Sequence, residues 1–308
     1  MNRKFTPKKL TIVSGIALVL LVALIVILIF VSRSGRESAI PSRVTLYRPE
    51  TSEIVTLSYE DFLCGCVAGL LPEGQSQYNA EALRAIAIAE NSRALYVLNN
   101  RGAAFTAPYA KVEAVNFGAD FVTNADFPYI STEISVTLRT AVQNAMNSVL
   151  RFNEEPINAP MCKISAGRTD EDALSPSVAL PCDIDEKGFE SRMAFTPDEI
   201  LSALHNKGVL SADCSNWFGK SAYSDSGTLM FIEFGEMKYT GAELKRLLGL
   251  RSTAITIQFA EDKFCFICRG FGENRGMSIS ATNFLAKTGK TAEEILAVFY
   301  PNCEIVRE

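Results

Sequence analysis

The sequence is poor in histidine: among its 308 residues there is a single one, His205. A metal site with two or more imidazole ligands cannot be built from one histidine. His205 falls in the middle of a stretch predicted to be helical, with no cysteine or acidic pattern beside it, which favours a surface position. We therefore expect no metal site and no cofactor.

Basic runs are also missing from the chain beyond its N-terminus, and the formal net charge is -5. A protein that binds nucleic acid usually carries a basic stripe or patch. We therefore expect no nucleic-acid partner. Internal repeats and low-complexity tracts are absent as well, which argues against a repeat architecture.

Cysteine is present in unusual number for an extracellular domain, with eight residues at scattered spacings. The close pairs are Cys64-x-Cys66, in a predicted helix, and Cys265-x-x-Cys268, in a predicted strand. Neither spacing brings two thiols to the same side of its element. The pattern favours cysteine as a small buried hydrophobic residue, and leaves partial disulfide pairing and metal binding as alternatives.

One long hydrophobic run is present, because residues 10–31 contain no charged side chain. At about 1.5 Å per residue a helix of this length spans ~33 Å, close to the thickness of a bilayer core. Arg3, Lys4, Lys8 and Lys9 precede the run, and this positive charge favours a cytoplasmic N-terminus. A single-pass anchor is the preferred interpretation, and a cleaved signal peptide is the alternative.

The anchor divides the chain into four predicted parts. We expect a short cytoplasmic tail at residues 1–9, a transmembrane helix at 10–32, a linker at 33–42 and one extracytoplasmic domain at 43–308. This organisation predicts a protein of the cell membrane whose C-terminal domain lies outside the cytoplasm.

The outer domain is predicted to belong to the α+β class. Its strands come as hairpins, at residues 44–58, 227–241 and 252–270, and not as regular strand-helix-strand units. The alanine-rich stretch 79–98 predicts a central core helix with close neighbours. No element is assigned to residues 103–135. Further helices are expected at residues 58–71, 135–150 (leading into a strand), 196–210, 240–250 and 291–301.

Five segments of this domain, in order, resemble the stage II sporulation protein D family. They are "VTLSYEDFLCGCVAGLLP", "EALRAIAIAENSRAL", "SAGRT", "TGAELKRLLGLRST" and the glycine-rich "RGFGENRGMSIS", which starts at Arg269. Each motif is weak alone, but together they cover most of residues 44–303. The resemblance implies a glycan groove formed by Leu70, Arg84, Ser165, Gly167, Thr169, Arg269, Gly272, Glu273, Gly276, Met277 and Ser278.

The resemblance also implies an activity, since the family member with this layout cleaves peptidoglycan glycan strands as a lytic transglycosylase during engulfment of the forespore. It works beside a cell-wall amidase and a multi-span membrane protein. Its catalytic glutamate precedes a Met-Pro pair. Such a carboxyl protonates the leaving oxygen and then assists attack by the sugar's own hydroxyl.

This sequence departs from the family pattern at the positions that carry the chemistry. The catalytic glutamate corresponds to Leu70, which cannot transfer a proton. In the long helix, Ile86 and Asn91 replace a glutamine and an arginine. In the glycine-rich segment, Glu273 and Ile279 replace a histidine and a glutamine. The glycines persist while polar groups are lost.

Three functions remain open on this basis. The first is a wall-facing protein that binds peptidoglycan glycan or scaffolds an engulfment machinery, with a degenerate catalytic site. The second is an active lytic transglycosylase that uses a displaced carboxylate, Glu273 or Glu73. The third is a protein-interaction module whose groove is filled; Leu70, Ile86 and Ile279 would make such a groove partly apolar.

Overall fold

A computed structural model describes residues 40–48, 51–72, 78–100, 121–123, 126–127, 129–130, 132–204 and 210–308. The predicted transmembrane helix at residues 10–32 lies outside these ranges. Across the ranges that are described, no helix combines the length and the apolar composition needed to cross a membrane. The described residues belong to one compact unit, Ile40–Glu308.

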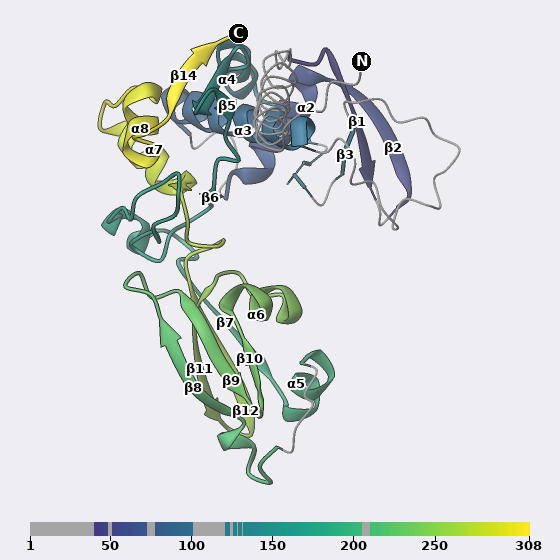
Figure 1. Ribbon diagram of the computed structural model, residues 1–308, viewed down its shortest axis with the longest axis vertical. Helices are drawn as coiled ribbons and strands as arrows, with labels where there is room; N and C mark the ends of the chain where they lie inside the picture. Colours follow the sequence, from purple (N-terminus) through teal and green to yellow (C-terminus); the bar gives the residue numbers. More distant parts are fainter. Residues whose placement is uncertain are drawn as a thin grey trace, which may run out of the picture. The chain divides into compact units, whose positions relative to one another are not determined.

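The unit mixes helices with small sheets, which confirms the predicted α+β class (Figure 1). The helices are α2 (Tyr59–Leu70), α3 (Ala80–Asn100), α4 (Val136–Ala145), α5 (Pro197–Ala203), α6 (Gly241–Leu248), α7 (Ile279–Lys287) and α8 (Ala292–Phe299), with 3-10 turns η3 (Pro181–Asp185) and η4 (Cys214–Asn216). The strands are β1 (Arg43–Arg48), β2 (Glu53–Ser58), β3 (Phe121–Thr123), β4 (Ser148–Phe152), β5 (Glu155–Pro156), β6 (Met161–Cys162), β7 (Glu190–Phe195), β8 (Phe218–Tyr223), β9 (Leu229–Phe234), β10 (Met237–Tyr239), β11 (Ala254–Ala260), β12 (Lys263–Arg269), β13 (Met277–Ser278) and β14 (Glu304–Arg307).

The three predicted hairpins form as expected: β1 pairs with β2, β9 with β10, and β11 with β12, all antiparallel. Each hairpin then gains a third strand from elsewhere in the chain, so that the sheets run β2-β1-β3, β10-β9-β8 and β11-β12-β7. Strand β3 lies in the stretch left unassigned from the sequence. Its three residues pair parallel with β1, and such a short run carries no period of its own.

Helix α3 lies at the centre of the first hydrophobic core, as its alanine content predicts. Its alanines are good helix formers and their small side chains let neighbouring helices approach. It packs against α2, α4, α7 and α8. Most of its first four turns are buried, including Ile86, which has no exposed surface.

A second hydrophobic core lies between sheet β10-β9-β8, sheet β11-β12-β7 and helices α5 and α6. Its centre is aromatic: the Trp217 ring stacks on Phe264 at 5.7 Å and meets Phe234 edge-on at 6.1 Å. Such contacts add to the stabilisation from burying the rings themselves. This core positions α6, and therefore Lys245, for the site described below.

The predicted helix starts are confirmed in detail. Ser58 accepts a hydrogen bond from the Asp61 amide at the start of α2. Thr196 and Thr240 each form a reciprocal capping box with a glutamate three residues later. The predicted length of the helix at 196–210 is wrong. It ends at Ala203 because Leu204 turns into an extended conformation and buries its side chain in the second core. His205 lies outside the described residues.

All eight cysteines are free thiols. Cys64, Cys66, Cys162 and Cys268 are buried, which agrees with a role as small core residues. Burial is also the main reason that the pKa of the Cys64 thiol is raised to about 12. Cys265 is only half-buried where Cys268 is buried, as expected for two sides of strand β12. The described residues hold no cluster of three or more candidate metal ligands.

Candidate functional site

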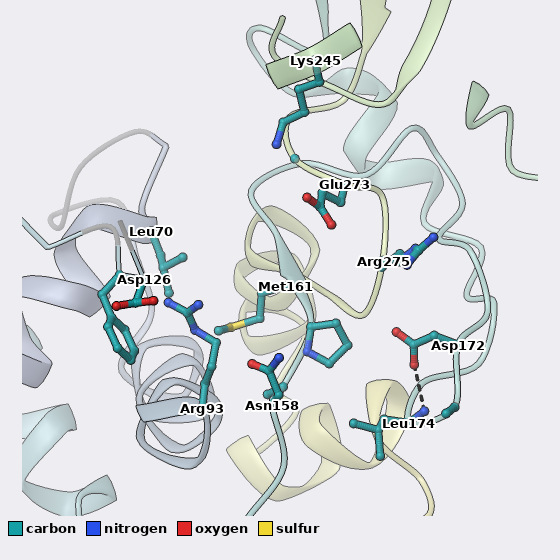
Figure 2. Close-up of a pocket in the computed structure, with 15 residues that line it drawn as sticks. Leu70, Arg93, Asp126, Asn158, Met161, Asp172, Leu174, Lys245, Glu273 and Arg275 are labelled. Atoms are coloured by element: carbon teal, nitrogen blue, oxygen red, sulfur yellow. Dashed lines mark hydrogen bonds between the residues drawn. The ribbon is translucent and has the colours of Figure 1, made fainter. Parts of the chain in front are cut away.

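A cavity of about 720 Å³ opens on the surface of the unit and is lined by segments far apart in the sequence (Figure 2). Helix α2 contributes its last residue, α3 its fourth turn, and α6 a lysine. Four further segments, at residues 126–127, 158–161, 172–174 and 272–275, complete the wall. The side chains that line it include apolar groups (Leu70, Phe127, Met161, Leu174), cations (Arg93, Lys245, Arg275) and carboxylates (Asp126, Asp172, Glu273). The wall of the cavity therefore carries as many cationic side chains as carboxylates.

The glycine-rich segment after β12 forms one wall of the cavity by packing against the "SAGRT" turn. The Phe271 amide donates to the Ile164 carbonyl at 2.7 Å. Asn274 has a left-handed φ of 59° and its side-chain oxygen accepts from the Ala166 amide at 2.8 Å. The segment is therefore a joint between two loops, and it leaves Glu273 exposed at the cavity.

Below this joint lies a buried polar cluster around Asp183. Its carboxylate accepts hydrogen bonds from the Ser165 amide at 2.8 Å and from the Ser278 hydroxyl at 2.7 Å. Thr169 is also fully buried, and its hydroxyl accepts from the Val178 amide at 2.9 Å. These serines and this threonine tie loops together and have no surface in the cavity.

Of the groove residues implied by the resemblance, Leu70, Gly272 and Glu273 line the cavity. The others lie elsewhere. Arg84 pairs with Glu81 and Glu293. Arg269 is exposed on strand β12. The remaining ones are buried or partly buried residues of loops and of strand β13, namely Ser165, Gly167, Thr169, Gly276, Met277 and Ser278.

The two other apolar replacements are not cavity residues. Ile86 and Ile279 have no exposed surface and belong to the first hydrophobic core. The expectation that they join Leu70 in an apolar cleft is therefore wrong, since they point into the protein. Glu73 lies outside the described residues, so its place relative to the cavity stays a prediction.

Arg93 is the cavity residue that is held most firmly. Its Nε and Nη2 atoms donate to the two carboxylate oxygens of Glu90 at 3.0 and 3.1 Å. Its guanidinium lies over the Phe127 ring, 4.5 Å from the centroid. Burial acts to lower the pKa of Arg93, but the adjacent Glu90 carboxylate outweighs it and the pKa is raised. The side chain is therefore a fixed cation.

Sequence reasoning did not single out the Glu90–Arg93 ion pair as part of a site. It did not identify Arg93, Lys245 or Arg275 as site residues. The spacing of Glu90 and Arg93 on one helix was the available signal. This charged pair lies on a helix that is otherwise rich in alanine and largely buried, and its arginine lines the cavity.

The three cavity carboxylates differ in what they bind. Asp126 accepts from the Thr123 amide at 3.0 Å. Asp172 accepts from the amides of Leu174 and Ser175, both at 2.8 Å. Within the described part of the chain, no hydrogen bond or ion pair engages the Glu273 carboxylate, which leaves it available to a ligand.

Asp183 makes the stability of the protein depend on pH. Burial raises the pKa of Asp183 above its usual 3.8, against the opposing hydrogen bonds from Ser165 and Ser278. A carboxyl whose pKa is higher in the folded state contributes fully to stability below its unfolded pKa. That contribution is lost as the pH rises through the folded pKa, at ~1.4 kcal/mol per pKa unit.

We therefore expect Asp183→Asn to gain stability relative to the wild type as the pH rises from about 4 to about 7. Urea unfolding of both proteins at a series of pH values measures the difference in free energy of unfolding. If the difference in free energy of unfolding stays constant across that pH range, the raised pKa of Asp183 is contradicted.

The fold and the cavity define an α+β protein with an open, charge-balanced surface site. No protein-family model matches the chain. Stage II sporulation protein D of Bacillus subtilis (strain 168) is 25% identical over 280 residues, which cover 87% of this chain and 80% of that protein. The protein of the same name from Bacillus amyloliquefaciens is 22% identical over 287 residues, or 86% and 79% of the two chains. Over most of its length the chain is therefore similar to stage II sporulation protein D, which supports the family resemblance drawn from its motifs.

Proposed function

We propose that this protein serves sporulation as a membrane-anchored, wall-facing protein that binds the glycan strands of peptidoglycan without cleaving them. The sporulation role follows from the names of its two relatives and the length over which they align. Its cavity then holds a glycan strand in place. The cell-wall amidase and the membrane protein expected from the family resemblance are its proposed partners in the machinery.

The observation that carries this proposal is the place of Leu70. It lines the cavity at the end of α2, where the family resemblance puts the catalytic glutamate. An aliphatic side chain can neither donate nor accept the proton that glycosidic cleavage requires. A leucine at this position therefore supports a cavity that binds glycan without cleaving it.

The composition of the cavity suits a sugar polymer. Arginine, lysine, asparagine and carboxylate side chains supply both donors and acceptors for hydroxyl groups, and Phe127 and Met161 supply apolar contact. A cavity of about 720 Å³ has room for more than one sugar ring. Its openness favours ligand binding over the alternative of a groove filled by its own side chains.

Cleavage by a displaced carboxylate is the second candidate, because Glu273 lines the same cavity and has no partner among the described residues. A carboxyl that acts as a general acid is usually enclosed by apolar groups, which keep it protonated. Glu273 is exposed. We therefore expect no cleavage products from either the wild type or Glu273→Gln, and products of cleavage by the wild type that vanish in this variant would support the second candidate.

Co-sedimentation with purified sacculi tests the proposed binding. We expect the full-length protein to pellet with sacculi and to be released by soluble glycan strands. A protein that stays in the supernatant under all salt conditions contradicts glycan binding and favours a module that contacts only other proteins.

A further inference from the structure

Two cations, Lys163 and Arg251, lie against the ring of Phe271, and none of these three residues lines the cavity. We propose that they form a separate site for a phosphate group. The proposal adds a second kind of ligand to the one assigned to the cavity, and it does not rest on glycan binding.

Backbone hydrogen bonds between three segments of the chain build this site. The Lys163 amide donates to the Phe271 carbonyl at 2.8 Å, and the Phe271 amide donates to the Ile164 carbonyl at 2.7 Å. The Gly272 amide donates to the Arg251 carbonyl at 2.9 Å. The main chain at both cations is therefore fixed relative to the ring.

The two charged groups approach the same ring. The Lys163 Nζ atom is 5.0 Å from the Phe271 centroid, and the guanidinium carbon of Arg251 is 4.4 Å from it. Their charges therefore lie within about 10 Å of each other, roughly one screening length. Gly188 makes room for the guanidinium, because a Cβ built on it would lie 3.2 Å from Nη1 of Arg251.

No carboxylate among the described residues balances these two cations. Neither side chain takes part in an ion pair or donates a hydrogen bond within those ranges, and both are only partly exposed. Burial, and after it the charge of Arg251, lower the pKa of Lys163. The folded protein therefore holds two like charges close together, and a bound anion would relieve their repulsion.

A phosphate group suits this arrangement better than a carboxylate does. A phosphate monoester carries about -1.5 to -2 charges at neutral pH, close to the combined charge of one lysine and one arginine. Its oxygens point in several directions, so they can accept from an ammonium and from a guanidinium that approach differently. A carboxylate carries one charge and its two oxygens match a single guanidinium fork.

Phosphorus NMR of inorganic phosphate mixed with the full-length protein tests the site without any variant. We expect the protein to broaden the phosphate resonance, and acetate at the same ionic strength to leave it broad. If glycerol phosphate restores the sharp resonance, the site accepts phosphate carried as an ester. If it does not, the site takes free phosphate, and both results support the proposal. A resonance that stays sharp, or that acetate sharpens as well as glycerol phosphate does, overturns it.

Lys163→Met then locates the binding, because it removes the charge and keeps an unbranched side chain. We expect this variant to bind phosphate about 10-fold more weakly or worse, the factor for one hydrogen bond between charged groups. Without phosphate it should unfold at the same temperature as the wild type or at a higher one, because the repulsion from Arg251 is gone. Unchanged phosphate binding by Lys163→Met overturns the proposal.

Lys238→Met is the matched control. Lys238 also lies over a phenylalanine ring, 4.7 Å from the Phe231 centroid, but it pairs with Glu233 at 3.6 Å. Its loss should leave phosphate binding unchanged, and an equal weakening in both variants would overturn the assignment to Lys163. If Lys163→Met does not fold, Arg251→Gln makes the same comparison.

Discussion

Gly276→Ala is expected to lower the free energy of unfolding by about 4 kcal/mol or more, among the largest losses that one substitution produces. Gly276 has a φ of +65°, and a Cβ built on it lies 1.9 Å from the carbonyl oxygen of Pro160. That oxygen cannot easily move away, because it accepts hydrogen bonds from the Met277 amide and the Tyr300 hydroxyl. The added methyl must therefore push the glycine-rich segment away from the loop that contains Pro160.

Gly249→Ala is the matched control for this prediction. Gly249 has the same φ of +65°, at the end of α6, but nothing lies within 4 Å of a built Cβ. It should lose only the cost of the left-handed backbone, about 1–2 kcal/mol. Urea unfolding of the full-length proteins gives both values. Equal losses would show that backbone conformation, and not the contact with Pro160, accounts for Gly276.

Glu90→Leu is expected to cost about 3–5 kcal/mol, because it leaves the Arg93 charge without its partner in a largely buried position. Glu90 has no exposed surface, and Arg93 is 21% exposed. The double variant Glu90→Leu/Arg93→Leu should recover most of the loss, since two apolar groups of similar size can replace a buried pair. Failure to recover would show that the pair also supports the surrounding packing.

A more exposed Glu–Arg pair, between α3 and α8, serves as the control. Arg84 pairs with Glu293, which is 48% exposed, so Glu293→Leu should change the free energy of unfolding by less than about 1 kcal/mol. Chemical unfolding of both variants against the wild type measures the contrast. Similar losses of unfolding free energy at Glu90 and Glu293 would contradict the claim that the burial of Glu90 makes its removal the more costly one.

Local signals in the sequence were sufficient for much of the fold. The alternating hairpin strands and the alanine-rich stretch are patterns that depend only on neighbouring residues. The helices and hairpins predicted for the described residues formed, although α5 is shorter than expected. Strands β3, β8 and β14 were missed because each is stabilised by pairing with another strand, and the local sequence pattern does not reveal that partner. The end of α5 was missed because Leu204 is drawn into the second core by a tertiary contact.

The site was harder to predict, because distant segments build it. The family resemblance pointed to Leu70, Gly272 and Glu273, which line the cavity. It also pointed to Ser165 and Ser278, whose polar groups hold the buried Asp183. A motif in one sequence cannot separate residues that touch a ligand from residues that support the wall behind it. Arg93 has no motif, and only the fold brings it to the cavity.

The central claim is that the cavity binds glycan and does not cleave it. Mass spectrometry of glycan strands and sacculi incubated with the full-length protein tests this most directly. We expect no 1,6-anhydromuramoyl products from the wild type, even where binding is complete, because Leu70 lines the cavity where the family resemblance places the acid. Such products from the wild-type protein that are lost on Glu273→Gln would contradict the account and assign the chemistry to Glu273.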